Sequence, residues 1–240
     1  MLQASLGDDL SYCEFYSDAE CCRSVPCTRG GAARVRYQKG HDLDLALPVD
    51  LPGVRYLVQY RDPVAEAVSD RELFLSATGF TTPPTSDQYT HWLAGKVRYF
   101  AGFAGKWLRR PLPEVLVIDY DRLVADPVSV LDEVCRHVGI SRSREAIEQV
   151  SSREAGIVRR PPIALAGAPP IEFSPRRIEE SQCFRPDLLA EYESAVLERV
   201  PELESKRRLP RVDRPQTALS ALVESAELAA TGDHAGAGRR

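Results

Sequence analysis

The chain has 240 residues, of which 43% are hydrophobic, so it is long enough to bury a core, and its length favours one domain with a tail. A formal net charge of −4 argues against a broad basic surface for nucleic acid but leaves room for a small anion pocket. No segment approaches the roughly 18 apolar residues that a membrane-spanning helix needs. We therefore expect neither a nucleic-acid nor a membrane partner.

Two features of composition bear on the source and compartment. The only lysines are Lys39, Lys96, Lys106 and Lys206 among 31 basic residues, an arginine bias typical of a GC-rich bacterial genome. Four of the six cysteines fall within the first 27 residues without a clean pair of Cys-x-x-Cys motifs, which is weak evidence for zinc. No signal peptide precedes them, so we expect reduced thiols in a cytoplasmic protein, with a metal site as the alternative.

The first half of the chain alternates strands and helices. Residues 1–7 resemble the end of a helix closed by a glycine, and a cysteine-bearing loop follows. Residues 34–39 alternate as in a short strand, whereas residues 54–60 form a largely apolar run suited to a central parallel strand. Asp62 and Pro63 then supply the N-cap and first residue of a helix at 64–75.

A loop at 78–86 separates this helix from a long amphipathic helix at 87–110, whose aromatic residues we assign to the core. A third strand is predicted at 114–120, and Asp126 with Pro127 starts a helix that ends near Val138, before Gly139. Strands that alternate with helices in this way indicate an α/β fold with a parallel sheet.

The pattern loosens from residue 151 onward. Two proline-rich stretches mark a long loop, and residues 186–200 form the last well-defined helix. We therefore expect one domain over residues 1–210. Residues 211–240 are predicted to be a disordered tail with a marginal helix at 217–228.

Arg61 and Ser69 are the first candidate site residues. Arg61 follows the predicted strand at 54–60, and Ser69 lies two turns into the next helix. Nucleotides bind at the carboxyl ends of parallel strands, where an arginine offers two donors to a phosphate and a serine adds a hydroxyl. The alternative is that Arg61 pairs with a nearby acid and Ser69 has no binding role.

Lys39 and His41 are the second candidate pair. They are two residues apart at the end of a predicted strand, so both can project to one face. A neutral imidazole can take a proton from a hydroxyl, and an ammonium can stabilise charge on a leaving phosphate. The alternative is a histidine in a polar loop beside Asp42 and Asp44.

These motifs together resemble the family of sulfotransferases that use 3'-phosphoadenosine 5'-phosphosulfate (PAPS). Lys39-x-His41, then Arg61-Asp-Pro, then Ser69 have the order and spacing of that family. Residues 117–123 and Asp126-Pro127 look like its strand, Tyr-Glu-Asp-Leu turn and following helix. The resemblance covers residues 1–200. It implies a bacterial-type enzyme with a three-layer fold, a parallel sheet flanked by helices, like that of P-loop nucleotide hydrolases.

The resemblance also implies roles for individual residues. Arg61 and Ser69 would bind the 3'-phosphate of PAPS, Tyr120 would lie near the adenine, His41 would be the general base and Lys39 would contact the phosphosulfate. The basic segment that the family places over the 3'-phosphate is best matched by Arg176 and Arg177, although the usual Arg-Lys-Gly is replaced and both could be solvated charges. The family reaction needs no metal and releases adenosine 3',5'-bisphosphate (PAP).

The beginning of the chain departs from the family. The strand and glycine-rich loop that wrap the 5'-phosphosulfate should precede residues 1–7, so we expect an N-terminally truncated fold with impaired activity. The function expected is sulfuryl transfer from PAPS to a hydroxyl of a small molecule or carbohydrate. The alternative is a nucleotide-binding or interaction protein derived from a sulfotransferase that no longer catalyses. The pattern leaves the acceptor and the oligomeric state open.

Overall fold

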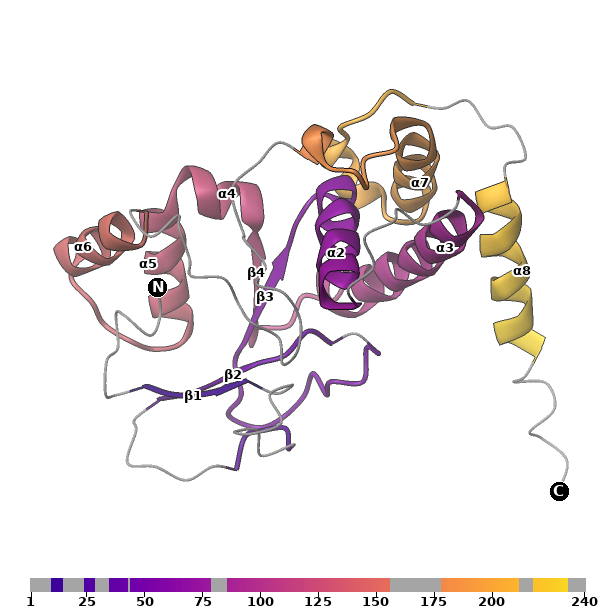
Figure 1. The fold of residues 1–240 in the computed structure, drawn as a ribbon. Helices are drawn as coiled ribbons and strands as arrows, with labels where there is room; N and C mark the ends of the chain where they lie inside the picture. The colour runs from indigo at the N-terminus through magenta and orange to yellow at the C-terminus, as the bar shows by residue number, and fades with distance from the viewer. Residues whose placement is uncertain are drawn as a thin grey trace, which may run out of the picture. The chain divides into compact units, whose positions relative to one another are not determined.

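The computed structural model describes residues 10–14, 24–28, 35–42, 44–78, 86–155, 178–211 and 218–232 (Figure 1). The chain divides into two compact units, residues 1–60 with 106–158 and residues 61–105 with 159–240. The first unit carries all the described strands, and the second is built from helices. This mixture of helices and parallel strands confirms the predicted α/β class.

The strands of the first unit form two parallel pairs. Strand β1 (Leu10–Glu14) pairs with β2 (Val35–Lys39), and the Tyr12 and Tyr37 rings stack with centroids 5.7 Å apart. Strand β3 (Tyr56–Tyr60) pairs with β4 (Val115–Asp119). The strands predicted at 34–39, 54–60 and 114–120 are thus confirmed, whereas β1 forms where a loop was expected.

Three helices complete the first unit: α4 (Tyr120–Ala125), α5 (Pro127–His137) and α6 (Arg144–Ala155). Helix α5 packs against β4 and against both other helices. Its start is fixed by Asp126, whose Oδ1 accepts a hydrogen bond from Ser129 N at 3.1 Å. Gly139, with φ +75°, follows its end, a left-handed conformation that glycine adopts without strain. The prediction of this helix is confirmed.

The second unit packs four α-helices around one core: α2 (Pro63–Thr78), α3 (Ser86–Phe103), α7 (Pro186–Arg199) and α8 (Ala218–Gly232). Helices α7 and α8 both lie against α3, as Figure 1 shows. Short 3₁₀ turns, η3 (Ile178–Glu180) and η4 (Pro201–Lys206), flank α7. The predicted helices at 64–75 and 186–200 are confirmed. The one at 87–110 is an α-helix only to Phe103 and continues as a π-helix, η2 (Ala104–Leu108).

The interior of the second unit combines aromatic and aliphatic side chains. Tyr89, Leu93 and Val97 are buried on α3, opposite Tyr192 and Val196 on α7. On α8, Leu219 and Val223 are also buried, so this helix contributes to the core. Of the six aromatic residues assigned to the core, those at 89, 100 and 107 are buried, whereas those at 92, 99 and 103 are only half-buried.

Two further findings concern the cysteines and membrane-spanning helices. Cys13, Cys27, Cys135 and Cys183 are buried thiols, whereas Cys21 and Cys22 lie outside the described residues. None of the described helices is long and apolar enough to cross a bilayer.

The expected helix end at 1–7 and most of the loop at 78–86 also lie outside the described residues.

Candidate functional site

Arg61 and Ser69 lie together at the start of the second unit. Arg61 directly follows β3, and an Arg61 Nη donates a hydrogen bond to Ser69 Oγ at 3.3 Å. Between them, Asp62 caps α2 by accepting a hydrogen bond from Ala65 N on Oδ1 at 2.8 Å. The predicted helix start therefore determines where both side chains lie. Ser69 is exposed and the Arg61 side chain is 31% exposed, so both can be reached from solvent.

A second arginine, Arg208, which follows η4, joins this cluster. Its Nε lies 3.0 Å from Asp62 Oδ1, and Arg61 Nε lies 3.8 Å from Asp62 Oδ2. Asp62 is only 1% exposed, so one buried carboxylate contacts two guanidinium groups. The sequence analysis left open whether Arg61 pairs with a local acid or faces a phosphate. The structure shows it in contact with both Asp62 and the Ser69 hydroxyl.

The main chain at Arg208 is fixed by Glu193 of α7. Both carboxylate oxygens of this buried residue accept backbone hydrogen bonds, from Arg208 N at 2.6 Å and from Leu209 N at 2.8 Å. Burial raises the pKa of Glu193 above its ordinary value, although the two amide hydrogen bonds oppose the shift. Arg208 could not be selected from the sequence, because no local motif marks a residue whose partners lie so far away in the chain.

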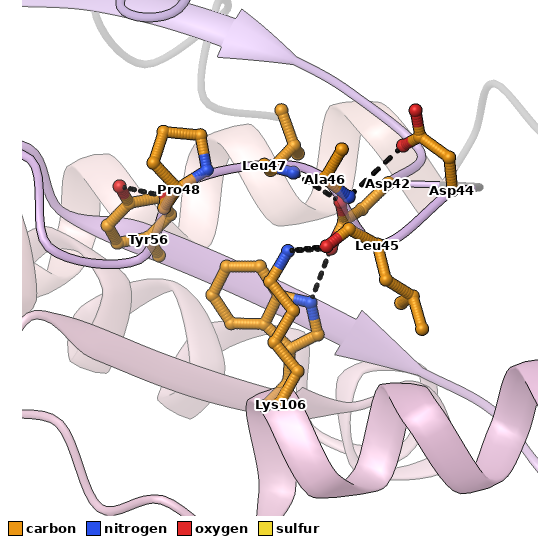
Figure 2. A network of polar contacts seen from close by, with 9 residues as sticks. Asp42, Asp44, Leu45, Ala46, Leu47, Pro48, Tyr56 and Lys106 are labelled. Atoms are coloured by element: carbon orange, nitrogen blue, oxygen red, sulfur yellow. Dashed lines mark hydrogen bonds and ion pairs between the residues drawn. The ribbon is translucent and has the colours of Figure 1, made fainter. Parts of the chain in front are cut away.

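Lys39 and His41 lie in the first unit. Lys39 ends β2, and His41 follows after Gly40 with its side chain exposed. The next residue, Asp42, is buried and adopts φ +47°. Figure 2 shows its contacts with Lys106 and with the loop that follows. The pair was predicted at the end of a strand, and that placement is confirmed.

Tyr120 begins α4 directly after β4, where the sequence led us to expect a turn. Asp119 Oδ1 accepts a hydrogen bond from Asp121 N at 2.9 Å and so caps this helix. The Tyr120 side chain is half-buried. The corresponding segment is therefore a strand followed at once by a short helix, which fixes Tyr120 at the carboxyl end of β4.

Comparisons with known proteins identify the family. The family model of the sulfotransferase domain matches residues 35–154, half of the chain. The chain belongs to the sulfotransferase domain family. Lys39, His41, Arg61, Ser69 and Tyr120 of this sulfotransferase domain all fall within the matched residues.

A solved structure agrees with the fold. The crystal structure of mouse sulfotransferase SULT7A1 complexed with PAP resembles the chain with a TM-score of 0.50 and 16% sequence identity, over 80% of this chain and 70% of that one. At this identity the likeness shows a shared fold. No curated protein matches the chain.

The remaining predictions for this sulfotransferase concern the two C-terminal arginines and metal binding. Arg176 and Arg177 lie outside the described residues. Among the residues that the structure describes, no group of three or more His, Cys, Asp or Glu side chains is placed to hold a metal ion.

Proposed function

We propose that the protein transfers a sulfuryl group from PAPS to a hydroxyl of a small molecule or carbohydrate. Family membership supports sulfuryl transfer in general. The observation that carries the more specific proposal is the 3.3 Å contact between Arg61 and Ser69, the two residues expected at the 3'-phosphate. PAPS carries this 3'-phosphate, whereas adenosine 5'-phosphosulfate does not. A site that binds the 3'-phosphate therefore favours PAPS as the donor.

The side chains around Arg61 include hydrogen-bond donors of the kind that bind phosphate. Arg61 and Arg208 both carry a guanidinium group that contacts the same carboxylate, and Ser69 adds a neutral hydroxyl. Guanidinium groups match phosphate oxygens in charge and geometry. We assign the 3'-phosphate to these residues, with Arg176 and Arg177 as further candidates, and the adenine to the neighbourhood of Tyr120.

His41 and Lys39 are assigned to the transfer itself. PAPS supplies the sulfuryl group and leaves as PAP. His41, exposed beside β2, would accept the proton of the acceptor hydroxyl, since a neutral imidazole is a suitable base near neutral pH. Lys39 would place its ammonium near the negative charge that develops on the leaving phosphate. No metal is assigned a part in these steps.

Calorimetry with PAP and a turnover assay test the proposal in two steps. The protein should bind PAP, and it should move label from radiolabelled PAPS to at least one of a panel of hydroxyl acceptors. His41→Ala should abolish turnover and leave PAP affinity intact, because the base acts on the acceptor.

His91→Ala is a matched control, because His91 is exposed on α3 and contacts Asp87 O of its own helix. PAP binding without turnover by any acceptor would support the alternative, a nucleotide-binding protein that no longer catalyses. Absence of PAP binding would reject both functions.

A further inference from the structure

Asp42, the residue after His41, is the centre of a buried polar network (Figure 2). Its Oδ2 accepts hydrogen bonds from Lys106 Nζ at 2.7 Å and from Trp107 Nε1 at 2.8 Å. Its Oδ1 accepts a third from Leu47 N at 2.9 Å. The side chain of Asp42 is therefore fixed by donors from two separate parts of the first unit.

The same network holds the loop that follows. The Asp42 carbonyl accepts a hydrogen bond from Leu45 N at 3.0 Å, and Lys106 Nζ also donates to Leu45 O at 2.9 Å. Asp44 Oδ1 accepts from Ala46 N at 3.2 Å. Main-chain and side-chain hydrogen bonds thus tie Asp42 to residues 44–47 of the loop and to Lys106.

The two donors come from a distorted part of a helix. Lys106 and Trp107 are consecutive residues, whose side chains would diverge by about 100° on a regular α-helix. They lie on the π-helix η2, whose wider turn reduces that angle, and both reach the same oxygen of Asp42. The Trp107 ring packs on Tyr56, with centroids 5.4 Å apart, and Lys106 Nζ lies 4.7 Å from the Trp107 ring centroid. π-Helical turns are rare in proteins, and those that occur are often found at functional sites.

Each part of this arrangement has an energetic cost. A left-handed conformation at a residue other than glycine is strained, and a buried ion pair must repay the desolvation of both charges. A loop that needed only stability could use a glycine and apolar contacts instead. Two costly features, the positive φ and the desolvated ion pair, therefore meet at the residue next to His41, which indicates that a defined geometry at this point is required.

We propose that Asp42 is a positioning residue for His41. Lys106 and Trp107 act through Asp42: they fix the direction in which the chain leaves β2 and thereby the range of positions open to the imidazole. This inference rests on the proposed role of His41 as the base, and it assigns Asp42 no contact with substrate.

Two substitutions and one control test the role. Trp107→Phe removes one donor to Asp42 and keeps an aromatic ring against Tyr56. Asp42→Asn keeps the shape of the side chain but loses its charge. Trp92→Phe is the matched control, because Trp92 is the other tryptophan of the chain and stacks on Tyr89 of the second unit.

The first measurement is the NMR spectrum of protein labelled in its four histidine rings, with the His41 signal assigned by its loss in His41→Ala. The His41 ring signal should move or broaden in Asp42→Asn and in Trp107→Phe, and should stay unchanged in Trp92→Phe. His91, on α3 of the second unit, is an internal reference that should not move in either variant. Unchanged His41 signals in both variants overturn the inference, whether or not the protein turns over.

The second measurement separates kcat from KM. Misplacement of a catalytic group by about 1 Å can cost 100-fold in rate, so kcat should fall by about 10- to 100-fold while acceptor KM and PAP affinity are retained. A lower melting temperature with normal kcat would show a purely structural contact and overturn the inference. If His41→Ala itself keeps full turnover, the assignment of the base fails instead. If Asp42→Asn does not fold, Trp107→Phe decides the question alone.

Discussion

Replacing Arg61 by alanine should weaken PAP binding by an amount that follows from its surroundings. The side chain is 31% exposed and its guanidinium contacts Ser69 and Asp62, so it is partly desolvated and held in place before the ligand arrives. A hydrogen bond to a charged group contributes about 1.5–3 kcal/mol. Because 1.4 kcal/mol corresponds to a factor of ten, Kd should rise about 10- to 150-fold.

Ser69 provides a second measure of the same site. Ser69→Ala removes a neutral hydroxyl, so its effect should be smaller, about 0.5–1.5 kcal/mol. The two residues are in contact, so their effects should not add. Once Arg61 is gone, loss of Ser69 should matter less, and the double variant should lose less affinity than the sum of the single losses.

Isothermal titration calorimetry with PAP measures all three variants. Arg144→Ala is the matched control, because Arg144 is 79% exposed and pairs with Glu148 on α6. Thermal melts should accompany the titrations, since Asp62 loses one of its two arginine neighbours in Arg61→Ala. Equal PAP affinity of Arg61→Ala and the unaltered protein would remove Arg61 from the phosphate site.

Three predictions concern stability. Asp62→Ala should cost about 2–4 kcal/mol in a denaturant titration, the sum of a helix cap and a charged hydrogen bond, and Asp62→Asn should recover the cap. Burial lowers the pKa of Lys96, but Glu66 and Asp70, at 2.7 and 2.6 Å, more than offset this and raise it overall. Its stabilisation is therefore fully present below the ordinary lysine pKa and is lost as the pH rises from there through the raised pKa of the folded state. Lys96→Met should be less stable at neutral pH and lose less stability in strong alkali, and parallel pH profiles would contradict this. Tyr192→Phe should raise the melting temperature, because the described residues offer its buried hydroxyl no hydrogen-bond partner; a lower melting temperature would point to a partner.

Helix boundaries could be predicted from the sequence because their chemistry is local. Asp62 and Asp126, each followed by a proline, cap α2 and α5 through a side-chain oxygen and a nearby amide. Gly139 follows the end of α5 with a positive φ. The proximity of Arg61 and Ser69 could be predicted for the same reason, since both sit at the beginning of one helix. Their roles in binding stay predictions.

Features that depend on distant partners were not predicted. Strand β1 has no strong local pattern and owes its form to parallel pairing with β2. No helix was predicted at α6, where the described side chains bury only Ile147 and Ser151. Asp42 entered the prediction only in the alternative that His41 lies in a polar loop, because its sequence neighbours give no indication of Lys106.

The way in which Glu193 holds residues 208 and 209 has a consequence for redesign. It binds the main-chain amides of Arg208 and Leu209, which every residue except proline carries. The course of the main chain at residues 208 and 209 thus does not depend on which side chains these two positions carry. Position 208 can be changed to lysine, glutamine or a labelled cysteine while the backbone keeps its course, so the charge beside Asp62 can be varied one step at a time. A proline at 208 or 209 would do the opposite, because it removes one of the two amide donors through which Glu193 holds the segment.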